Sequence, residues 1–362
     1  MNTYIQNSLP ELKQLIRDLC AIPAPSHHEE KRAEFIQKWM ISNGFPHVFV
    51  DEAHNVLSEV GEGDVTVFLA HTDTVFPDLT PMAVREENGR YYCPGVTDDT
   101  AQLAVLLICA RYFLQRSPKH GIVIAANSCE EGLGNLKGSR AIVARYGSRM
   151  KELVAIDHHN LHEVVGKAVG SRRYRVTVRT EGGHSFTKFG NPNAIHKLAQ
   201  IIDRLYQVEV PVIGDSKTTY NVGLISGGTS VNTIAQEAQM LYEYRSDSHA
   251  CMAEMERQFR AIVEDAEVEL IGERPCAAEV DTERQTELLE RTKAVFRTAL
   301  HIEPEVRAGS TDCNAALGAG IPAICFGGCI GGGTHTREEY LELDSLERGC
   351  RLLMTFMDHY FA

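Results

Sequence analysis

The first informative stretch reads Val65-Thr66-Val67-Phe68-Leu69-Ala70, a short run that is almost entirely apolar and rich in β-branched residues. Two later runs have the same character, Gly121-Ile122-Val123-Ile124-Ala125-Ala126 and Leu153-Val154-Ala155-Ile156. Because none of the three alternates between apolar and polar residues, each is typical of a central strand covered on both faces of a sheet. An apolar helical pattern at residues 101–114 separates the first two runs. This alternation predicts an α/β fold with a mixed, largely parallel sheet covered by helices.

Two helical patterns precede the first strand. Ser8-Leu9-Pro10 has the cap and early proline that are typical of a helix start, and an apolar stripe continues from there to Leu19. The second pattern covers residues 28–42 and is closed by Asn43-Gly44. We therefore expect one helix that begins near Ser8 and a second that ends near Ser42.

The character of the sequence changes near residue 166. Residues 173–179 alternate cleanly between charged or polar and apolar side chains, as expected of a strand with one solvent-facing side. Further patterns indicate helices at 193–205 and 249–264 and strands at 219–225, 238–245 and 268–272. From about residue 282 the helical α/β character returns, ending with an amphipathic stretch at 345–357. Since insertions are tolerated best at surface loops, we expect one α/β domain (residues 1–165 and 281–362) interrupted by a smaller α+β domain (166–280).

The composition of the 362-residue chain is that of a globular protein, with 43% apolar and 23% charged residues. The 36 Lys and Arg residues against 49 Asp and Glu residues give a net charge of −13. Because the chain is acidic and has no basic block, we expect neither nucleic acid nor a membrane as a partner. No apolar run approaches the roughly 18 residues of a membrane span, and no secretory signal is visible. These features lead us to expect a cytoplasmic protein.

Acidic and imidazole side chains follow each of the three predicted central strands. The groups are His71-Thr72-Asp73, Glu130-Glu131 and Asp157-His158-His159. Because ligands of open α/β sheets bind outside the carboxyl ends of the strands, we expect these groups to face one crevice. Asp98-Asp99 opens the helix between the first two strands, and His335 follows a glycine run that could bring backbone close to a bound species. Taken singly, each would be explained as a solvated loop residue or a helix cap.

Histidine, aspartate and glutamate without cysteine form a ligand set that suits zinc, manganese or cobalt. A carboxylate shared between two ions would create a two-metal site, and ions about 3.5–4 Å apart polarise a carbonyl and generate hydroxide near neutral pH. The pair Glu130-Glu131 could then divide its work, one carboxylate binding metal while the other accepts a proton from the bridging water. The pattern indicates a hydrolase.

These motifs resemble, in order and over nearly the whole chain, those of the co-catalytic zinc exopeptidases. That family includes glutamate carboxypeptidase, peptidase T, succinyl-diaminopimelate desuccinylase and aminoacylase. The three matching motifs are His71-Thr72-Asp73-Thr74-Val75, Gly95-Val96-Thr97-Asp98-Asp99 and Glu130-Glu131-Gly132. The resemblance implies the zinc exopeptidase fold and two divalent ions, with zinc expected and cobalt or manganese as alternatives.

The resemblance also implies a role for each residue of the site. Glu130 would be the general base, and Asp73 would orient a histidine ligand. Asp98 would bridge both ions, and His335 is followed by Glu339-Tyr340, which is similar to the acidic-aromatic tail of the family. The complete set of implied metal ligands is His71, Asp98, Glu131, Asp157 and His335.

The inserted domain resembles the ferredoxin-like lid and dimerisation domain of the family. Gly182-Gly183-His184-Ser185 is similar to the motif whose imidazole reaches across a dimer to stabilise the tetrahedral oxyanion. Asn232 resembles the asparagine that contacts substrate, and Arg245 falls where the family has an arginine that clamps the substrate carboxylate. The resemblance implies a homodimer through this domain. The alternatives are that His184 is a turn residue and Arg245 a charge on a strand face.

Several positions depart from the family pattern. Thr100 stands where the family usually has lysine, and Glu243 replaces the aspartate that is usual two residues before the arginine. His158 and His159 follow Asp157 where a small residue is common. Residues 309–314 resemble a family loop that borders the site, and we expect them to form part of the pocket wall.

The sequence therefore predicts a metal-dependent hydrolase that cleaves an amide bond of short peptides in the manner of an exopeptidase. The first alternative is an amidohydrolase acting on N-acyl or N-succinyl amino acids. The second is a non-catalytic homologue, for which Thr100 is the one hint, since the expected ligands and the base are all in the sequence.

Overall fold

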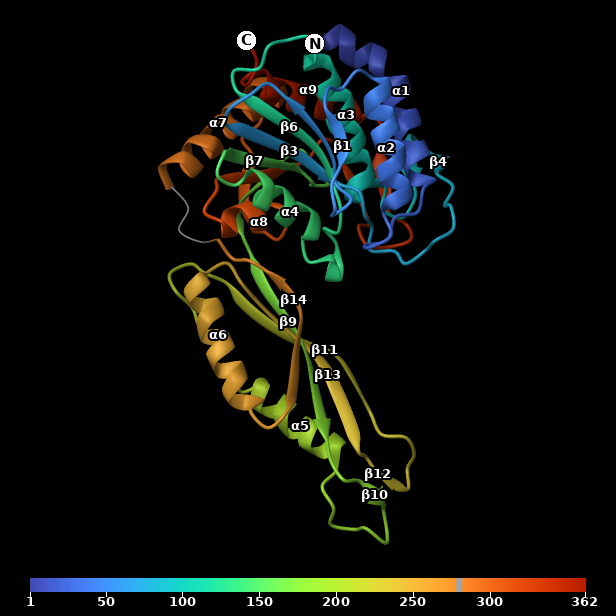
Figure 1. Cartoon of the computed structure of the whole chain (residues 1–362), viewed down its shortest axis with the longest axis vertical. Helices are drawn as coiled ribbons and strands as arrows, with labels where there is room; N and C mark the ends of the chain where they lie inside the picture. The colour runs from blue at the N-terminus through green and yellow to red at the C-terminus, as the bar shows by residue number, and fades with distance from the viewer. Residues whose placement is uncertain (278–281) are drawn as a thin grey trace. The chain divides into compact units, whose positions relative to one another are not determined.

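The computed structural model describes residues 1–277 and 282–362 of the chain. These residues divide into two compact units (Figure 1). The first unit comprises residues 1–168 and 282–362, and the second comprises residues 169–277. The first domain boundary was expected between residues 165 and 166, and the units divide between 168 and 169. The second expected boundary, between 280 and 281, lies outside the described residues.

The first unit is built on an eight-stranded sheet. Its strands lie in the order β1-β2-β6-β3-β7-β16-β8-β15. The central strand β3 pairs in parallel with β6 and β7, and β16 and β15 form further parallel pairs with β7 and β8. Antiparallel pairs join β1 to β2, β2 to β6 and β8 to β16, so the predicted mixed and largely parallel sheet is confirmed. The bounds are β1 Val48–Val50, β2 Val56–Val60, β3 Val65–His71, β6 Gly121–Asn127, β7 Met150–Ile156, β8 Glu163–Ala168, β15 Glu305–Gly309 and β16 Ala323–Phe326.

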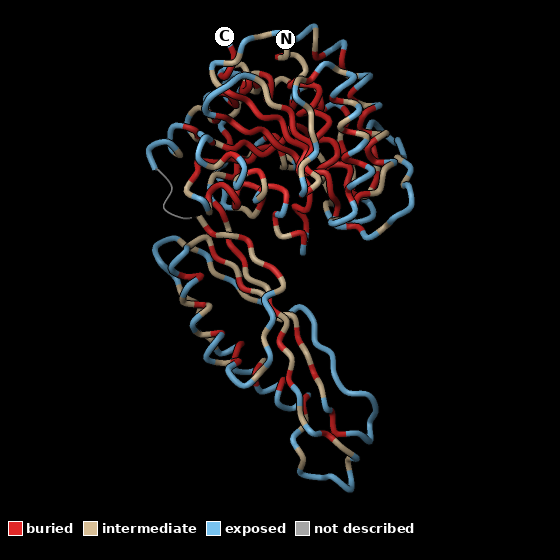
Figure 2. Tube along the Cα trace, in the orientation of Figure 1, coloured by how far each residue is buried: buried red, intermediate tan, exposed pale blue. Residues whose placement is uncertain are grey.

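β3 and β6 are buried along their whole length because helices cover both faces of the sheet (Figure 2). Successive side chains of a strand point to opposite faces. Phe68 and Ile124 therefore join the core formed with α1, α2, α3, α7 and α9, whereas Val67 and Val123 are buried on the other side. On that side α8 contacts β7, β8 and β16 and packs against α4. This double coverage explains why the runs are apolar without alternation.

The helices of the first unit differ in length, and none in the described residues combines the length and apolar character that a membrane span requires. Their bounds are α1 Asn2–Cys20, α2 Glu30–Ser42, α3 Ala101–Phe113, α4 Lys137–Tyr146, α7 Thr282–Leu300, α8 Cys313–Gly318 and α9 Ser345–Asp358. The first unit also contains two short segments of about one turn each, η1 Val96–Thr100 and η2 Gly132–Gly134.

The first helix begins earlier than the sequence pattern indicates. α1 begins at Asn2, so Pro10 lies inside the helix and not in its first turn. Ile5 is buried in the core, and the hydroxyl of Tyr4 donates to the carbonyl oxygen of Ile108 at 2.8 Å. These contacts hold the first turns in helical form although Pro10 has no N–H group to donate.

The second unit is the predicted α+β sandwich. Its sheet has the order β11-β13-β9-β14, and every pair in it is antiparallel. Helices α5 and α6 cover one face, where the Tyr242 and Phe259 rings stack with centroids 5.1 Å apart. A two-stranded ladder, β10 with β12, extends from one end of the sheet (Figure 1). The bounds are β9 Gly170–Arg179, β10 Gly183–His184, α5 Ala194–Leu205, β11 Thr218–Gly227, β12 Thr233–Ile234, β13 Glu237–Ser246, α6 His249–Ile262 and β14 Glu267–Arg274.

A small antiparallel sheet in the first unit joins two distant parts of the chain. Its order is β17-β18-β5-β4, with bounds β4 Arg85–Glu87, β5 Arg90–Tyr92, β17 Gly331–Gly332 and β18 Tyr340–Glu342. Because β18 pairs with β5, the loop after β17 lies next to the segment that leads into η1. Gly331 is required by this packing, since a Cβ there would lie 2.2 Å from Thr97 Cγ2 and 2.3 Å from the Tyr340 carbonyl oxygen.

Candidate metal centre

The strand ends bring most of the predicted ligands to one edge of the main sheet. β3 ends at His71, β7 ends directly before Asp157, and Glu131 follows shortly after the end of β6. These three strands are neighbours in the sheet and parallel, so their carboxyl ends lie at the same edge. Asp98 comes from η1, ahead of α3, and His335 comes from the loop between β17 and β18. Five separate segments of the first unit thus contribute to one site.

The carboxylate of Asp98 lies between two imidazoles. Its Oδ1 is 3.0 Å from His71 Nε2, and its Oδ2 is 3.1 Å from His335 Nε2. The same nitrogen of His335 is 3.2 Å from Glu131 Oε1. Asp157 joins His71 and Asp98 in a group whose ligand atoms all lie within 4.8 Å of one another.

The predicted ligands form two groups that share one residue. The first is His71 with Asp98 and Asp157, and the second is Asp98 with Glu131 and His335. Each group offers imidazole nitrogen and carboxylate oxygen, the donor set that suits a divalent ion such as zinc. The residues therefore fit two metal positions with Asp98 between them.

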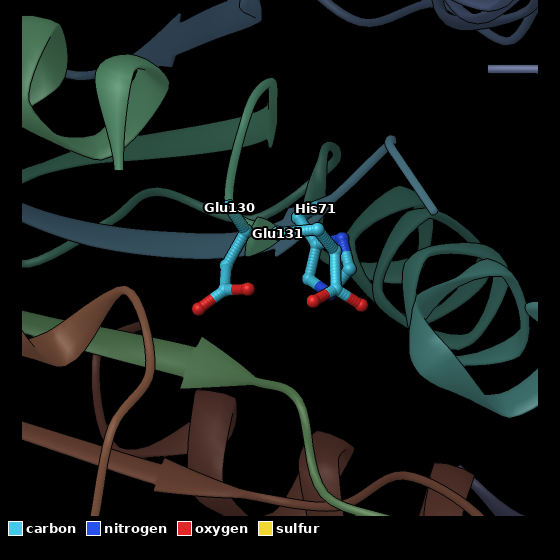
Figure 3. A group of neighbouring side chains, drawn as sticks. All are labelled: His71, Glu130 and Glu131. Carbon is cyan, nitrogen blue, oxygen red and sulfur yellow. The ribbon is translucent and has the colours of Figure 1, made fainter. Parts of the chain in front are cut away.

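Glu130 lies next to this arrangement. It forms a group with Glu131 and His71, in which one carboxylate oxygen of each glutamate and one ring nitrogen of the histidine lie within 4.8 Å of one another. Figure 3 shows the three side chains projecting to the same side, with Glu131 beside the imidazole and the carboxylate of Glu130 set apart from both. Glu130 belongs to neither of the groups that contain Asp98. Its position suits a group that exchanges a proton beside the metal positions.

The imidazoles supply positive charge among these carboxylates. Burial tends to lower the pKa of His71, but the nearby carboxylates of Asp99 and Asp73 raise it by more. The pKa of His71 therefore lies well above its ordinary value. Hydrogen bonds to Asp98 and Glu131 raise the pKa of His335 to about 10. Both rings therefore favour the protonated form in a chain without metal.

The carboxylates respond to their crowding in different directions. Burial and the charge of Asp98 raise the pKa of Glu131 to about 7. Burial, together with Asp98 and Glu130, also raises the pKa of Asp157 well above its ordinary value, against the attraction of His71. Burial also tends to raise the pKa of Asp98, but hydrogen bonds from His335 and His71 have the larger effect and hold this pKa below the ordinary range. A cation placed among these groups would relieve the repulsion.

Asp73 is buried beneath the site and connects several of its parts. Its Oδ1 accepts the backbone N–H of Glu130 at 2.9 Å, and its Oδ2 accepts that of Glu131 at 3.0 Å. The Ser26 hydroxyl donates to Oδ2 at 2.6 Å. The Nδ1 of His71 lies 3.4 Å from the Asp73 carboxylate and 3.0 Å from its carbonyl oxygen. Asp73 thus fixes the backbone of Glu130 and Glu131 and also faces the His71 ring.

Other residues support the site in ways that the sequence motifs do not reveal. Ser26 belongs to none of the motifs, and Asp99 gives no sign in the sequence that its Oδ2 accepts the His71 N–H at 2.8 Å. Asp312, in the predicted pocket-wall loop, accepts from Asn127 Nδ2 at 2.6 Å. Burial and the charge of Glu130 raise the pKa of Asp312 to about 7. The sequence signals were the acidic pair at 98–99 for Asp99 and the loop at 309–314 for Asp312, whereas Ser26 had none.

The departures from the family pattern are accommodated locally. Thr100 is buried, and its hydroxyl lies 3.4 Å from Nη1 of Arg32, which reaches in from α2 and also donates to the Thr72 carbonyl oxygen at 2.7 Å. A buried guanidinium thus stands beside the position where the family usually has lysine. His158 lies 3.3 Å from Glu163, and burial lowers its pKa to about 4. Among the described residues, neither His158 nor His159 belongs to a candidate metal group.

The three remaining predicted residues lie in the second unit. His184, on β10, and Asn232 are exposed and come from adjoining segments, since the Ser185 N–H donates to the Asn232 carbonyl oxygen at 2.9 Å. Arg245 lies near the other end of the sheet, on β13. It donates through Nε and Nη2 to Glu243, at 3.0 and 3.2 Å. Within this unit the structure places His184 near Asn232 and Arg245 apart from both.

Known proteins with similar sequences or structures include peptidases and a related amidohydrolase. The family described as peptidase family M20/M25/M40 matches residues 67–359. A succinyl-diaminopimelate desuccinylase of Corynebacterium glutamicum is 26% identical over 95% of this chain and 95% of its own length. Two solved structures share the fold over 97% of this chain and 98% of theirs: a tripeptidase of Staphylococcus aureus (TM-score 0.77, 19% identity) and the aminopeptidase PepT of Bacillus cereus (TM-score 0.74, 21% identity).

Proposed function

The chain belongs to peptidase family M20/M25/M40, and from this membership we propose that it hydrolyses a terminal amide bond of short peptides. It is an enzyme, a metal-dependent hydrolase of the amide bonds of peptides or N-acyl amino acids. The observation that carries the proposal is the carboxylate of Asp98, which belongs to two neighbouring groups of potential metal ligands. Two adjacent metal positions suit the hydrolysis of an unactivated amide.

The proposed cofactor is a pair of divalent ions, zinc in the first instance, with cobalt or manganese as alternatives. His71, Asp98 and Asp157 would hold one ion, and Asp98, Glu131 and His335 would hold the other. When bound, such ions supply Lewis-acid polarisation of a carbonyl and the activation of water near neutral pH.

Glu130 is proposed as the general base. Its carboxylate takes a proton from the attacking water and passes it to the nitrogen of the leaving group. The nitrogen then leaves as a neutral amine and not as an amide anion. The support is its place beside His71 and Glu131 and outside the two groups that share Asp98. Asp73 holds the Glu130 N–H at 2.9 Å and so keeps this carboxylate at the site.

Residues of the second unit are proposed to bind substrate and to assist the reaction. Arg245 and Asn232 would bind the substrate, Arg245 through a free carboxylate. Because the two residues lie apart within one chain, Asn232 would come from the second copy of a homodimer, as would His184, which would stabilise the oxyanion. The exposure of His184 and of the neighbouring Phe186 and Phe189 supports a partner at this end of the unit. The expectations of a cytoplasmic location, and of no nucleic-acid or membrane partner, stay predictions.

The second candidate is an amidohydrolase of N-acyl or N-succinyl amino acids. It is favoured by the relative named as a succinyl-diaminopimelate desuccinylase, whose match covers 95% of this chain and 95% of its own length. A substrate panel separates the two candidates: dipeptides and tripeptides with a free amine against the same amino acids carrying an acetyl or succinyl group. Turnover of the acylated compounds alone would replace the peptidase proposal with this one.

The decisive variant is Glu130→Ala, measured in the zinc-loaded enzyme. We expect it to keep the metal content of the parent and to lose kcat by about 10²–10⁴-fold or more, because it removes the base without removing a ligand. Glu338→Gln, an exposed carboxylate elsewhere in the first unit, is the matched control and should keep full activity. Activity of Glu130→Ala near that of the parent would reject this residue as the base. A parent without turnover on the whole panel would favour the non-catalytic alternative.

A further inference from the structure

Glu339 is a buried carboxylate four residues beyond His335. Its Oε1 accepts the N–H of Thr97 at 2.8 Å, the hydroxyl of Thr97 at 2.7 Å and the N–H of Asp98 at 3.0 Å. Its Oε2 accepts the N–H of Gly95 at 2.9 Å. All four donors lie in one turn, residues 95–98, and that turn carries Asp98.

This turn is irregular and takes much of its shape from Glu339. Asp98 has φ −114° and ψ 86°, which is not helical, although it lies between Gly95 and the start of α3. Backbone N–H groups in such a turn cannot all find helical partners, and three of them end on the Glu339 carboxylate. Hydrogen bonds to an ionised acceptor are stronger than those between neutral groups. The carboxylate therefore fixes the direction in which the Asp98 side chain leaves the backbone.

The segment between His335 and Glu339 is itself held to the same turn. The Glu339 N–H donates to the Thr336 carbonyl oxygen at 3.3 Å, and its own carbonyl oxygen accepts the Cys93 N–H at 3.1 Å. One short loop therefore carries His335 toward the site and closes on the backbone of the segment that presents Asp98.

We propose that Glu339 is a positioning residue that sets the carboxylate of Asp98 between the two candidate metal positions. Through its loop it also fixes the distance between Asp98 and His335, whose Nε2 lies 3.1 Å from Asp98 Oδ2. The inference rests on the proposed function in one respect, namely that Asp98 is the shared metal ligand. Glu339 acts through the backbone of residues 95–98 and is not one of the proposed metal ligands.

Glu339→Gln is the test variant. Glutamine has the same shape but a single acceptor oxygen, so its NH₂ group would face a backbone N–H of the turn, donor against donor. Glu338→Gln is the matched control, because it removes the same charge one position away from an exposed side chain paired with Arg85. Both variants are compared with the parent as metal-free full chains titrated with zinc and with cobalt by calorimetry.

We expect Glu339→Gln to weaken both binding steps by about 10–100-fold, the usual loss when a group that orients a ligand is removed. Glu338→Gln should bind like the parent. The cobalt absorption spectrum of Glu339→Gln should also change, because the geometry around Asp98 changes, and a lower unfolding temperature alone would not produce that change.

A structural role limited to the loop of His335 gives a different result. That role would weaken only the binding step that depends on His335, as we expect of His335→Ala measured alongside, and would leave the other step intact. Weakening of both steps supports the inference, and weakening of one step or of neither overturns it. If Glu339→Gln does not fold, Thr97→Val removes one donor to Oε1 with little change in shape, and unchanged zinc affinity in that variant overturns the inference.

The outcome is separable from that of the proposed function. A parent chain that binds no zinc defeats the proposed function before Glu339 is tested. A parent that binds two ions, together with a Glu339→Gln variant that binds them equally well, defeats only the inference about Glu339.

Discussion

Both oxygens of the Asp98 carboxylate are engaged, one with His71 and the other with His335. The remaining predicted ligands each belong to one of the two groups that share Asp98. Three carboxylates in so small a volume repel one another, and positive charge between them lowers the cost of burying them in the ionised form. Imidazolium groups supply that charge in the metal-free chain, and divalent ions would supply it in the loaded enzyme.

A pH dependence of stability follows from Asp312, which is fully buried and whose pKa is raised to about 7. In the unfolded chain an aspartate titrates near pH 4. Between about pH 4 and 7 the folded chain holds the proton and the unfolded chain does not, so the unfolding free energy falls as pH rises, by up to about 1.4 kcal/mol per unit. The stabilisation is complete at low pH and is lost as the pH rises through about 7.

Asp312→Asn should remove this part of the pH dependence. Urea unfolding of the metal-free parent and variant at pH 5 and pH 8 measures it, and the parent should lose more stability than the variant between the two values. Equal losses would show that Asp312 is ionised in the folded chain at both pH values.

At the scale of the element, α9 approaches the core more closely than a side chain would allow. A Cβ on Gly349 would lie 1.5 Å from the carbonyl oxygen of Gly328, in the segment between β16 and β17. Gly328 in turn donates its N–H to Gln102 Oε1 at 2.6 Å. The helix therefore packs on this loop through backbone contact, and the loop is held to α3 by the Gln102 side chain.

Gly349→Ala should destabilise the first unit by about 1–3 kcal/mol or more, because neither backbone can move without disturbing its neighbours. Arg348→Ala, on the solvent side of the same helix, is the control and should change stability by no more than about 0.5 kcal/mol. Thermal unfolding followed by circular dichroism measures both. A Gly349→Ala variant as stable as the parent would mean that the helix can shift away from Gly328.

The sequence predicts regular elements well where burial decides them. The runs at 65–70, 121–126 and 153–156 became β3, β6 and β7, and α3 covers residues 101–113. The start of α1 was placed too late, because Pro10 resembles a first-turn proline and the contacts that hold the preceding turns involve Ile108, far along the chain. The predicted ligands could be named from their motifs. Their division into two groups could not, because it depends on the backbone angles of η1 and on the path of the loop that carries His335.

At the scale of the whole molecule, the exposed edge of the second sheet bears on assembly. β11 is an edge strand of ten residues that contains no charged residue and no proline. The opposite edge, β14, carries Glu267 and Glu269, and such charges discourage pairing with another chain. Leu224 and Ile225 of β11 are about half exposed. An unprotected edge of this kind suits pairing with a second copy.

We therefore expect the protein to sediment at twice the mass of the chain and Leu224→Arg to shift it toward the monomer. Leu79→Arg, which places the same charge on an exposed leucine of the first unit, should leave the dimer intact. Analytical ultracentrifugation over a range of concentrations measures the equilibrium. A parent that stays monomeric would remove the dimer from the proposal, and an unaffected Leu224→Arg dimer would place the interface elsewhere.

The contacts of His71 and His335 with Asp98 have a consequence for how the protein acquires its cofactor. His71 and His335 each lie beside one oxygen of the Asp98 carboxylate, and the pKa of both imidazoles is raised. A metal ligand must give up its proton before it binds an ion, so metal loading is coupled to proton release. Zinc added to a stripped sample in weakly buffered solution should therefore acidify the solution.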